Sequence, residues 1–131
     1  NYRCGTGHSV SFVGNVHEGP HALNGRNTTL MRPGMIVTDE PGVYETDLVG
    51  IRIENELVCV HKADNQYGTF LGFEPIMFVP IATSPIVPGV LTKDELDWLN
   101  NYHRQVFEKL APRLNDEERE WLAKKCAAIG C

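Results

Sequence analysis

Three polar side chains have types and settings that suit metal binding: His8, Glu40 and Glu54. Their surroundings are apolar or rich in glycine, and one imidazole with two carboxylates could converge on a single cation. Mixed nitrogen and oxygen ligation suits Mn, Zn, Co or Fe better than an ion that prefers thiolates. The residues alone leave another interpretation open, in which His8 is a hydrogen-bonded structural residue and Glu54 pairs with Arg52 or with a lysine on a neighbouring strand.

Short extended segments must position His8 and Glu40. Residues 5–16 are mainly Gly, Ser and Val, a composition that suits an extended segment in which two backbones approach closely. Residues 35–37 form an apolar run that stops at the turn residues 38–42, which predicts a buried strand with Glu40 at its end.

A longer strand is predicted over residues 51–60, where polar and apolar residues alternate. In this pattern Arg52 and Glu54 share one face, and that face becomes apolar further along the strand. A buried charge needs a partner or a metal, so Glu54 remains a candidate ligand. Another strand is predicted over residues 69–81, with Pro75 as a signal for an edge or a bulge.

Two helices are predicted in the last forty or so residues. Thr92 with Glu95 has the spacing of a capping box, and Pro112 ends the apolar periodicity that follows. Asn115 repeats the capping signal, and Gly130 closes the second helix. Strands of antiparallel character followed by two helices predict an α+β fold.

Length and composition exclude several classes of protein. The 131 residues suffice for one domain or a piece of one, and no apolar stretch is long enough to span a membrane. Twelve Lys and Arg against 17 Asp and Glu disfavour nucleic acid as a partner. The four cysteines show no C-x-x-C pair and no secretory signal is visible, so we expect reduced thiols and a cytoplasmic location. The chain opens without an initiator Met, which suggests a cut or processed chain.

Other candidate residues have weaker settings. His17 lies in a turn and is either an exposed loop residue or a contact for a substrate. Cys4 could be a nucleophile, but no third orienting group is placed beside it. His61 and His103 are most simply a residue of a strand end and a residue of a helix face.

Three motifs resemble the C-terminal half of the catalytic domain in aminopeptidase P: GTGHSVSFVGNVHEGP at residues 5–20, GMIVTDEPGVYE at 34–45 and GIRIENELVCV at 50–60. This is the Xaa-Pro aminopeptidase branch of the pita-bread metallopeptidases, related to prolidase and creatinase. The segments FEPIMFVPI at 73–81 and LTKDELDWLNNYH at 91–103 resemble the C-terminal extension of the long, three-domain form.

The resemblance implies half of a pita-bread domain, a curved and mostly antiparallel sheet with two C-terminal helices. Residues 1–84 would belong to the catalytic domain and residues 85–131 to the helical extension packed on it. Such enzymes hydrolyse the N-terminal peptide bond that precedes proline, so the substrates implied are peptides with proline in the second position. A homodimer is implied for the parent protein.

The resemblance also implies roles for single residues. Two divalent cations, commonly manganese, would be held partly by His8, Glu40 and Glu54, with Glu40 as the general base and Glu54 bridging the cations. His17 would contact the substrate. Cys4 would line the proline pocket, and Arg52 would lie beside the carboxylates.

This chain departs from the family pattern in three ways. The two aspartate ligands of the family lie upstream of the His8 motif and are absent here, so we expect weak or no metal binding and no activity from these residues alone. Cys4 stands where many relatives have a histidine, and Ser9 and Ser11 replace glycines. The alternatives are a prolidase-like dipeptidase and a non-catalytic pita-bread protein that acts as a binding or scaffolding module.

Overall fold

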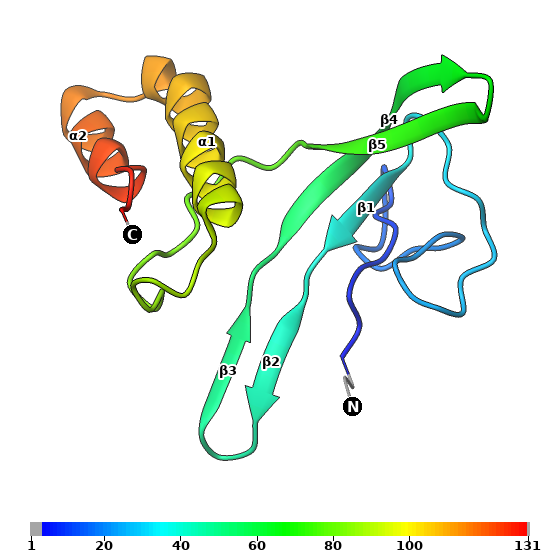
Figure 1. Cartoon of the computed structure of the whole chain (residues 1–131), viewed down its shortest axis with the longest axis horizontal. Coiled ribbons are helices and arrows are strands. Elements are labelled where there is room, and N and C mark those ends of the chain that lie inside the picture. The colour runs from blue at the N-terminus through cyan, green and yellow to red at the C-terminus, as the bar shows by residue number, and fades with distance from the viewer. Residues whose placement is uncertain (1–3, 131) are drawn as a thin grey trace. The chain divides into compact units, whose positions relative to one another are not determined.

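The computed structural model describes residues 4–130 and divides the chain into two compact units, one up to Met77 and the other from Phe78 on. The first unit contains all the strands, and the second contains the helices (Figure 1). The domain boundary predicted between residues 84 and 85 stays a prediction, because contact density defines compact units and not functional domains.

The first unit is built from antiparallel strands (Figure 1). β1 (Ile36–Asp39), β4 (Asn55–Asn65) and β5 (Gly68–Pro75) form a three-stranded sheet in the order β1-β4-β5. β2 (Gly42–Glu45) and β3 (Val49–Arg52) form a separate two-stranded ribbon. The predicted buried strand that ends at Glu40 is therefore β1.

The glycine-rich segment 6–9 lies along one edge of β1, and β4 pairs with the other edge. The backbone N–H of Thr38 donates to His8 O at 2.9 Å, and the N–H of Glu40 donates to Thr6 O at 2.6 Å. A Cβ atom at Gly7 would lie 1.9 Å from the carbonyl oxygen of Thr38, far inside van der Waals contact. The predicted close backbone approach is confirmed, and only glycine fits at its centre.

The strand predicted over residues 51–60 is interrupted, because Ile53 and Glu54 belong to neither β3 nor β4. The residue across from this gap explains it. Pro41 has no N–H to donate to Ile53, so only the bond from the Ile53 N–H to Pro41 O, at 3.3 Å, joins the two segments here. The prediction of one continuous strand was wrong for this reason.

The strand predicted over residues 69–81 is also shorter than expected, since β5 ends at Pro75. Residues from Phe78 on pack instead in the helical unit, where Val79 and Ile81 bond to side chains of a helix. The alternation of apolar residues in 76–81 reflects this packing and not a strand.

The helical unit contains α1 (Lys93–Leu110) and α2 (Asp116–Lys125). Thr92 and Asn115 are the N-caps, and each forms the predicted capping box with the glutamate three residues later. The core consists of Tyr102, Val106 and Leu122, against which the following partly buried residues pack: Phe78, Ile81, Phe107, Leu110, Leu114 and Cys126.

The second helix is shorter than predicted, since it ends at Lys125 and does not reach Gly130. The side chain of Asn100 donates to Ile129 O and accepts from Ile129 N–H, both at 3.0 Å. This paired contact uses backbone groups of Ile129 that a longer α2 would need, so residues 127–130 leave the helix and contact α1.

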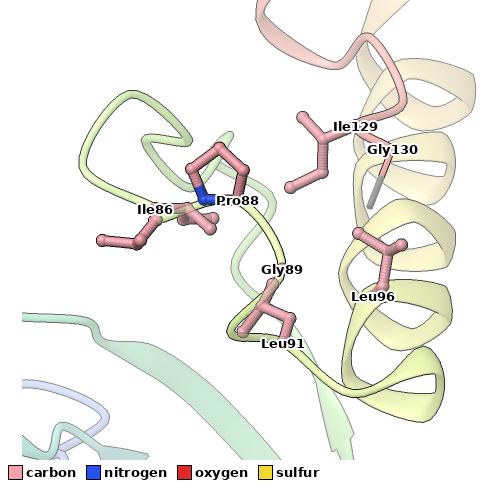
Figure 2. Close-up of a pocket in the computed structure, with 8 residues that line it drawn as sticks. Ile86, Pro88, Gly89, Leu91, Leu96, Ile129 and Gly130 are labelled. Carbon is pink, nitrogen blue, oxygen red and sulfur yellow. The ribbon is translucent and has the colours of Figure 1, made fainter.

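Figure 2 shows a small pocket that this returning segment helps to line. Its walls are apolar residues of the loop around Pro88, with Leu96 of α1 and Ile129. The space of about 20 Å³ holds roughly one water molecule, so the pocket suits no substrate.

Within residues 4–130, no helix combines the length and the hydrophobicity that crossing a membrane requires.

His103 makes the helical unit sensitive to acid. Its side chain is fully buried, and Nε2 accepts a hydrogen bond from the N–H of Ile81 at 3.0 Å. Burial lowers the pKa of His103 below its ordinary value of 6.5. The unfolded chain therefore binds a proton more readily than the folded one, and the stability contributed by neutral His103 is complete above pH 6.5 and is lost as the pH falls.

We expect the urea midpoint of the helical unit to fall between pH 7.5 and pH 5, measured by the fluorescence of Trp98 and Trp121. His103 is the only histidine from Phe78 on, so His103→Gln should remove most of this pH dependence. An unchanged dependence in that variant would show that other groups cause it.

Candidate metal centre

His8 and Glu40 meet at the edge of β1, with His8 Nε2 3.0 Å from Glu40 Oε1. Both side chains are largely buried, with exposed fractions of 21% and 16%. His8 Nδ1 lies 3.0 Å from the carbonyl oxygen of Ser9. A carbonyl oxygen only accepts hydrogen bonds, so Nδ1 carries the hydrogen. Nε2 then directs its lone pair at the carboxylate. Two electron-rich atoms at this distance need a proton or a cation between them.

Thr38 connects the two residues through its hydroxyl group. Its Oγ1 accepts the backbone N–H of His8 at 3.0 Å and donates to Glu40 Oε1 at 2.9 Å. The sequence prediction did not include this residue. Its spacing from Glu40 was the available signal, because residues two apart on an extended segment share a face.

Arg52 faces the other oxygen of Glu40. Its Nη1 lies 3.0 Å from Glu40 Oε2 and also donates to the carbonyl oxygens of Glu40 and, at 3.3 Å, of Gly5. Its Nε donates to the Tyr44 hydroxyl at 2.8 Å, and the guanidinium lies 5.4 Å from that ring. The Tyr44 ring lies against Gly50, where a Cβ atom would meet it at 3.0 Å. Tyr44 was also absent from the sequence prediction.

Glu54 is exposed, and its carboxylate forms no ion pair or hydrogen bond with His8 or Glu40. The strand register nevertheless places it across from Glu40. Asp39 pairs with Asn55 and Gly42 pairs with Arg52. Two residues separate these pairs on each strand, so the register continues through the gap and sets Glu40 opposite Glu54.

His17 lies beside His8, with ring centroids 4.2 Å apart and the rings tilted by 52°. The ring of His17 is exposed, so its face remains accessible. Cys4 carries a free, half-buried thiol that makes no hydrogen bond with His8, His17 or Glu40. The structure therefore brings His8, His17, Glu40 and Arg52 together, and it leaves Cys4 and Glu54 outside these contacts.

The donor atoms of this centre fit a divalent cation. Nε2 of His8 and Oε1 of Glu40 are ligand types of Mn, Zn and Fe, and the hydrogen bond from His8 Nδ1 to a carbonyl is the arrangement that orients metal-binding imidazoles. In the described part of the chain, no group of three or more His, Cys, Asp and Glu side chains is close enough to hold a metal ion. His8 and Glu40 are the two potential ligands that the structure brings together, and the roles predicted for the six site residues remain predictions.

Two family models match nearly the whole chain. A model of metallopeptidase family M24 matches residues 1–61, and a model described as the C-terminal region of peptidase_M24 matches residues 69–129. The first match includes every residue of the candidate centre, and the second begins within β5.

Named relatives show the same likeness. Aminopeptidase P2 of Arabidopsis thaliana is 47% identical over an alignment of 128 positions, which covers 92% of this chain and 18% of that protein. The probable Xaa-Pro aminopeptidase P of Coprinopsis cinerea is 42% identical over an alignment of 136 positions, which covers 98% of this chain and 22% of that protein. The chain spans about a fifth of the length of the curated relatives it matches.

A solved structure is similar as well. The X-prolyl aminopeptidase of Caenorhabditis elegans, described as a cytosolic enzyme with a di-nuclear active site, matches with a TM-score of 0.82 and 39% identity. The match covers 95% of this chain and 21% of that one. Together with the antiparallel strands and the two helices, this confirms the predicted α+β fold, part of a pita-bread domain.

Proposed function

We propose that this chain, which belongs to metallopeptidase family M24, forms the C-terminal part of the catalytic domain of an Xaa-Pro aminopeptidase. It would also contain the C-terminal extension of that enzyme. The parent chain would hydrolyse the N-terminal peptide bond before proline, and its substrates would be peptides with proline in the second position. The observation that carries this proposal is the 3.0 Å approach of His8 Nε2 to Glu40 Oε1, two ligand atoms that face each other at a largely buried site.

His8, Glu40 and Glu54 would hold the cations of this centre. Two divalent cations, when bound, supply the polarisation of a peptide carbonyl and the activation of water that amide hydrolysis needs at neutral pH. Glu40 would act as the general base. A carboxylate oxygen within hydrogen-bonding distance of the attacking water would accept its proton. Arg52 would hold that carboxylate in place through its contact with Oε2.

The position of Glu54 supports its inclusion. Two carboxylates directly opposite each other on antiparallel strands repel, which destabilises the pair unless a cation lies between them. Glu40 and Glu54 stand in this relation through the register on both sides of the gap. With a cation held at this centre, the exposed Glu54 side chain would turn toward His8 and Glu40 as a third ligand.

His17 would contact the substrate, since its ring is exposed and lies beside the ring of His8. Cys4 would line the pocket for proline. Because the amide nitrogen before proline is tertiary and the ring restricts the backbone, a dedicated pocket can recognise this bond where general peptidases fail.

Further properties of the parent are proposed from the family resemblance. We propose manganese as the metal, a homodimer as the assembly and a cytosolic location, the last because the similar worm enzyme is described as cytosolic. The 131 residues alone would be inactive, because this sequence offers three of the five metal ligands that the family uses.

The test is hydrolysis by the complete parent chain loaded with Mn²⁺. We expect release of the first residue from a tripeptide of the form Xaa-Pro-Xaa, with a kcat/KM at least about tenfold above that for the dipeptide Xaa-Pro. The present chain assayed alone serves as the inactive control. A preference for the dipeptide would favour a prolidase-like enzyme, and no hydrolysis of either peptide would favour a non-catalytic scaffold.

A further inference from the structure

The hydroxyl group of Thr38 departs from ordinary strand pairing. In a hydrogen-bonded antiparallel pair, the two residues exchange both of their backbone bonds. The N–H of Thr38 donates to His8 O, but the N–H of His8 donates to Thr38 Oγ1 and not to the Thr38 carbonyl. That carbonyl lies close to the backbone of Gly7, where an added Cβ atom would be 1.9 Å from its oxygen. The side chain of Thr38 thus replaces a backbone acceptor.

This replacement determines where the hydroxyl hydrogen points. Because Oγ1 accepts the His8 N–H, its single hydrogen is free for Glu40 Oε1, 2.9 Å away. Thr38 is only 2% exposed, and a β-branched side chain is stiff about χ1, so the hydroxyl has little freedom to turn elsewhere. One oxygen atom therefore holds the backbone of one proposed ligand and the carboxylate of the other.

We infer that Thr38 is a positioning residue of the metal centre: its hydroxyl sets the distance between His8 and the carboxylate of Glu40, so that both ligand atoms stand ready for the cation. This inference rests on the proposed function. Residues that orient metal ligands typically contribute 10- to 100-fold to metal affinity. Serine could replace threonine in this role, and an isosteric residue without a hydroxyl could not.

The first test measures amide hydrogen exchange in the 131-residue chain by NMR. In the wild type we expect the N–H of His8 to be protected, and in Thr38→Val its exchange should be about tenfold faster, since its acceptor is lost. Thr38→Ser should restore the protection. Thr69→Val is the matched control, because Thr69 also donates to a carboxylate, Asp64 Oδ1 at 2.7 Å, at an exposed site.

The second test measures Mn²⁺ affinity of the complete parent chain by electron paramagnetic resonance. The dissociation constant should rise at least about tenfold in Thr38→Val and should stay within about twofold of the wild type in Thr38→Ser and Thr69→Val. Thr38→Ala serves as a second hydroxyl-free variant in case Thr38→Val does not fold.

The possible failures differ. Fast exchange of the His8 amide in the wild type, or equal Mn²⁺ affinity in wild type and Thr38→Val, would overturn the role of Thr38. A wild-type parent that binds no Mn²⁺ would overturn the proposed function itself.

Discussion

Replacement of Glu40 by glutamine is expected to lower kcat/KM of the Mn²⁺-loaded parent by about a thousandfold or more. Glutamine keeps the shape of the side chain and an oxygen that can accept from Thr38. It removes the negative charge that Arg52 and His8 face, and it cannot accept the proton of water. The proposed ligand and the proposed general base are thus lost in one change, while the packing is preserved. The measurement is steady-state hydrolysis of a tripeptide of the form Xaa-Pro-Xaa.

Glu45→Gln is the matched control for this variant. Glu45 lies at the end of β2 and is exposed, so the same change in charge should leave kcat/KM within about twofold. Comparable losses in both variants would mean that net charge, and not the site, controls activity. Nearly full activity in Glu40→Gln would refute the role of Glu40.

The second large effect is expected for Gly7→Ala. The added methyl group would lie 1.9 Å from the carbonyl oxygen of Thr38, which is backbone and cannot turn away. The segment Thr6–Ser9 would have to separate from β1, which breaks its bonds to Thr38 and Glu40. We expect a loss of about 3 kcal/mol in the stability of this docked segment, or its complete detachment.

NMR hydrogen exchange at the Glu40 amide measures this loss in the strand-containing unit, since Trp98 and Trp121 report only on the helical unit. Gly5→Ala is the matched control, because a Cβ atom at Gly5 would meet nothing within 4 Å. Its effect should stay within about 1 kcal/mol. Equal protection of the Glu40 amide in wild type and Gly7→Ala would show that the close approach is not required.

The helices could be predicted from sequence because their signals are local. Thr92 and Asn115 form capping boxes with residues three positions away, and both boxes are present in the structure. The end of α2 could not be predicted in this way. It depends on Asn100, which is 29 residues from Ile129 in the chain and competes for its backbone groups.

The strands show the same contrast. β1 was predicted from an apolar run and a turn, both within a few residues. The gap at Ile53–Glu54 arises from Pro41 on the opposite strand, which has no N–H to donate to Ile53. Periodicity within one strand contains no information about the partner that interrupts it.

Part of the candidate site was foreseeable. His8 and Glu40 stood out by residue type and setting, and the structure places them in contact. Thr38 and Tyr44 did not stand out, because their roles depend on contacts with segments that lie elsewhere in the sequence, including His8 for Thr38 and Gly50 for Tyr44. Glu54 also stood out by residue type, but its side chain is exposed and forms no ion pair or hydrogen bond with His8 or Glu40.

Anomalous diffraction at the manganese edge, from crystals of the complete parent chain grown with Mn²⁺, would locate the cations. We expect anomalous peaks within coordination distance, about 2.0–2.3 Å, of His8 Nε2 and of carboxylate oxygens of both Glu40 and Glu54. A parent structure in which the Mn²⁺ peaks lie away from these three side chains, with His8 and Glu40 still in direct contact, would contradict this expectation.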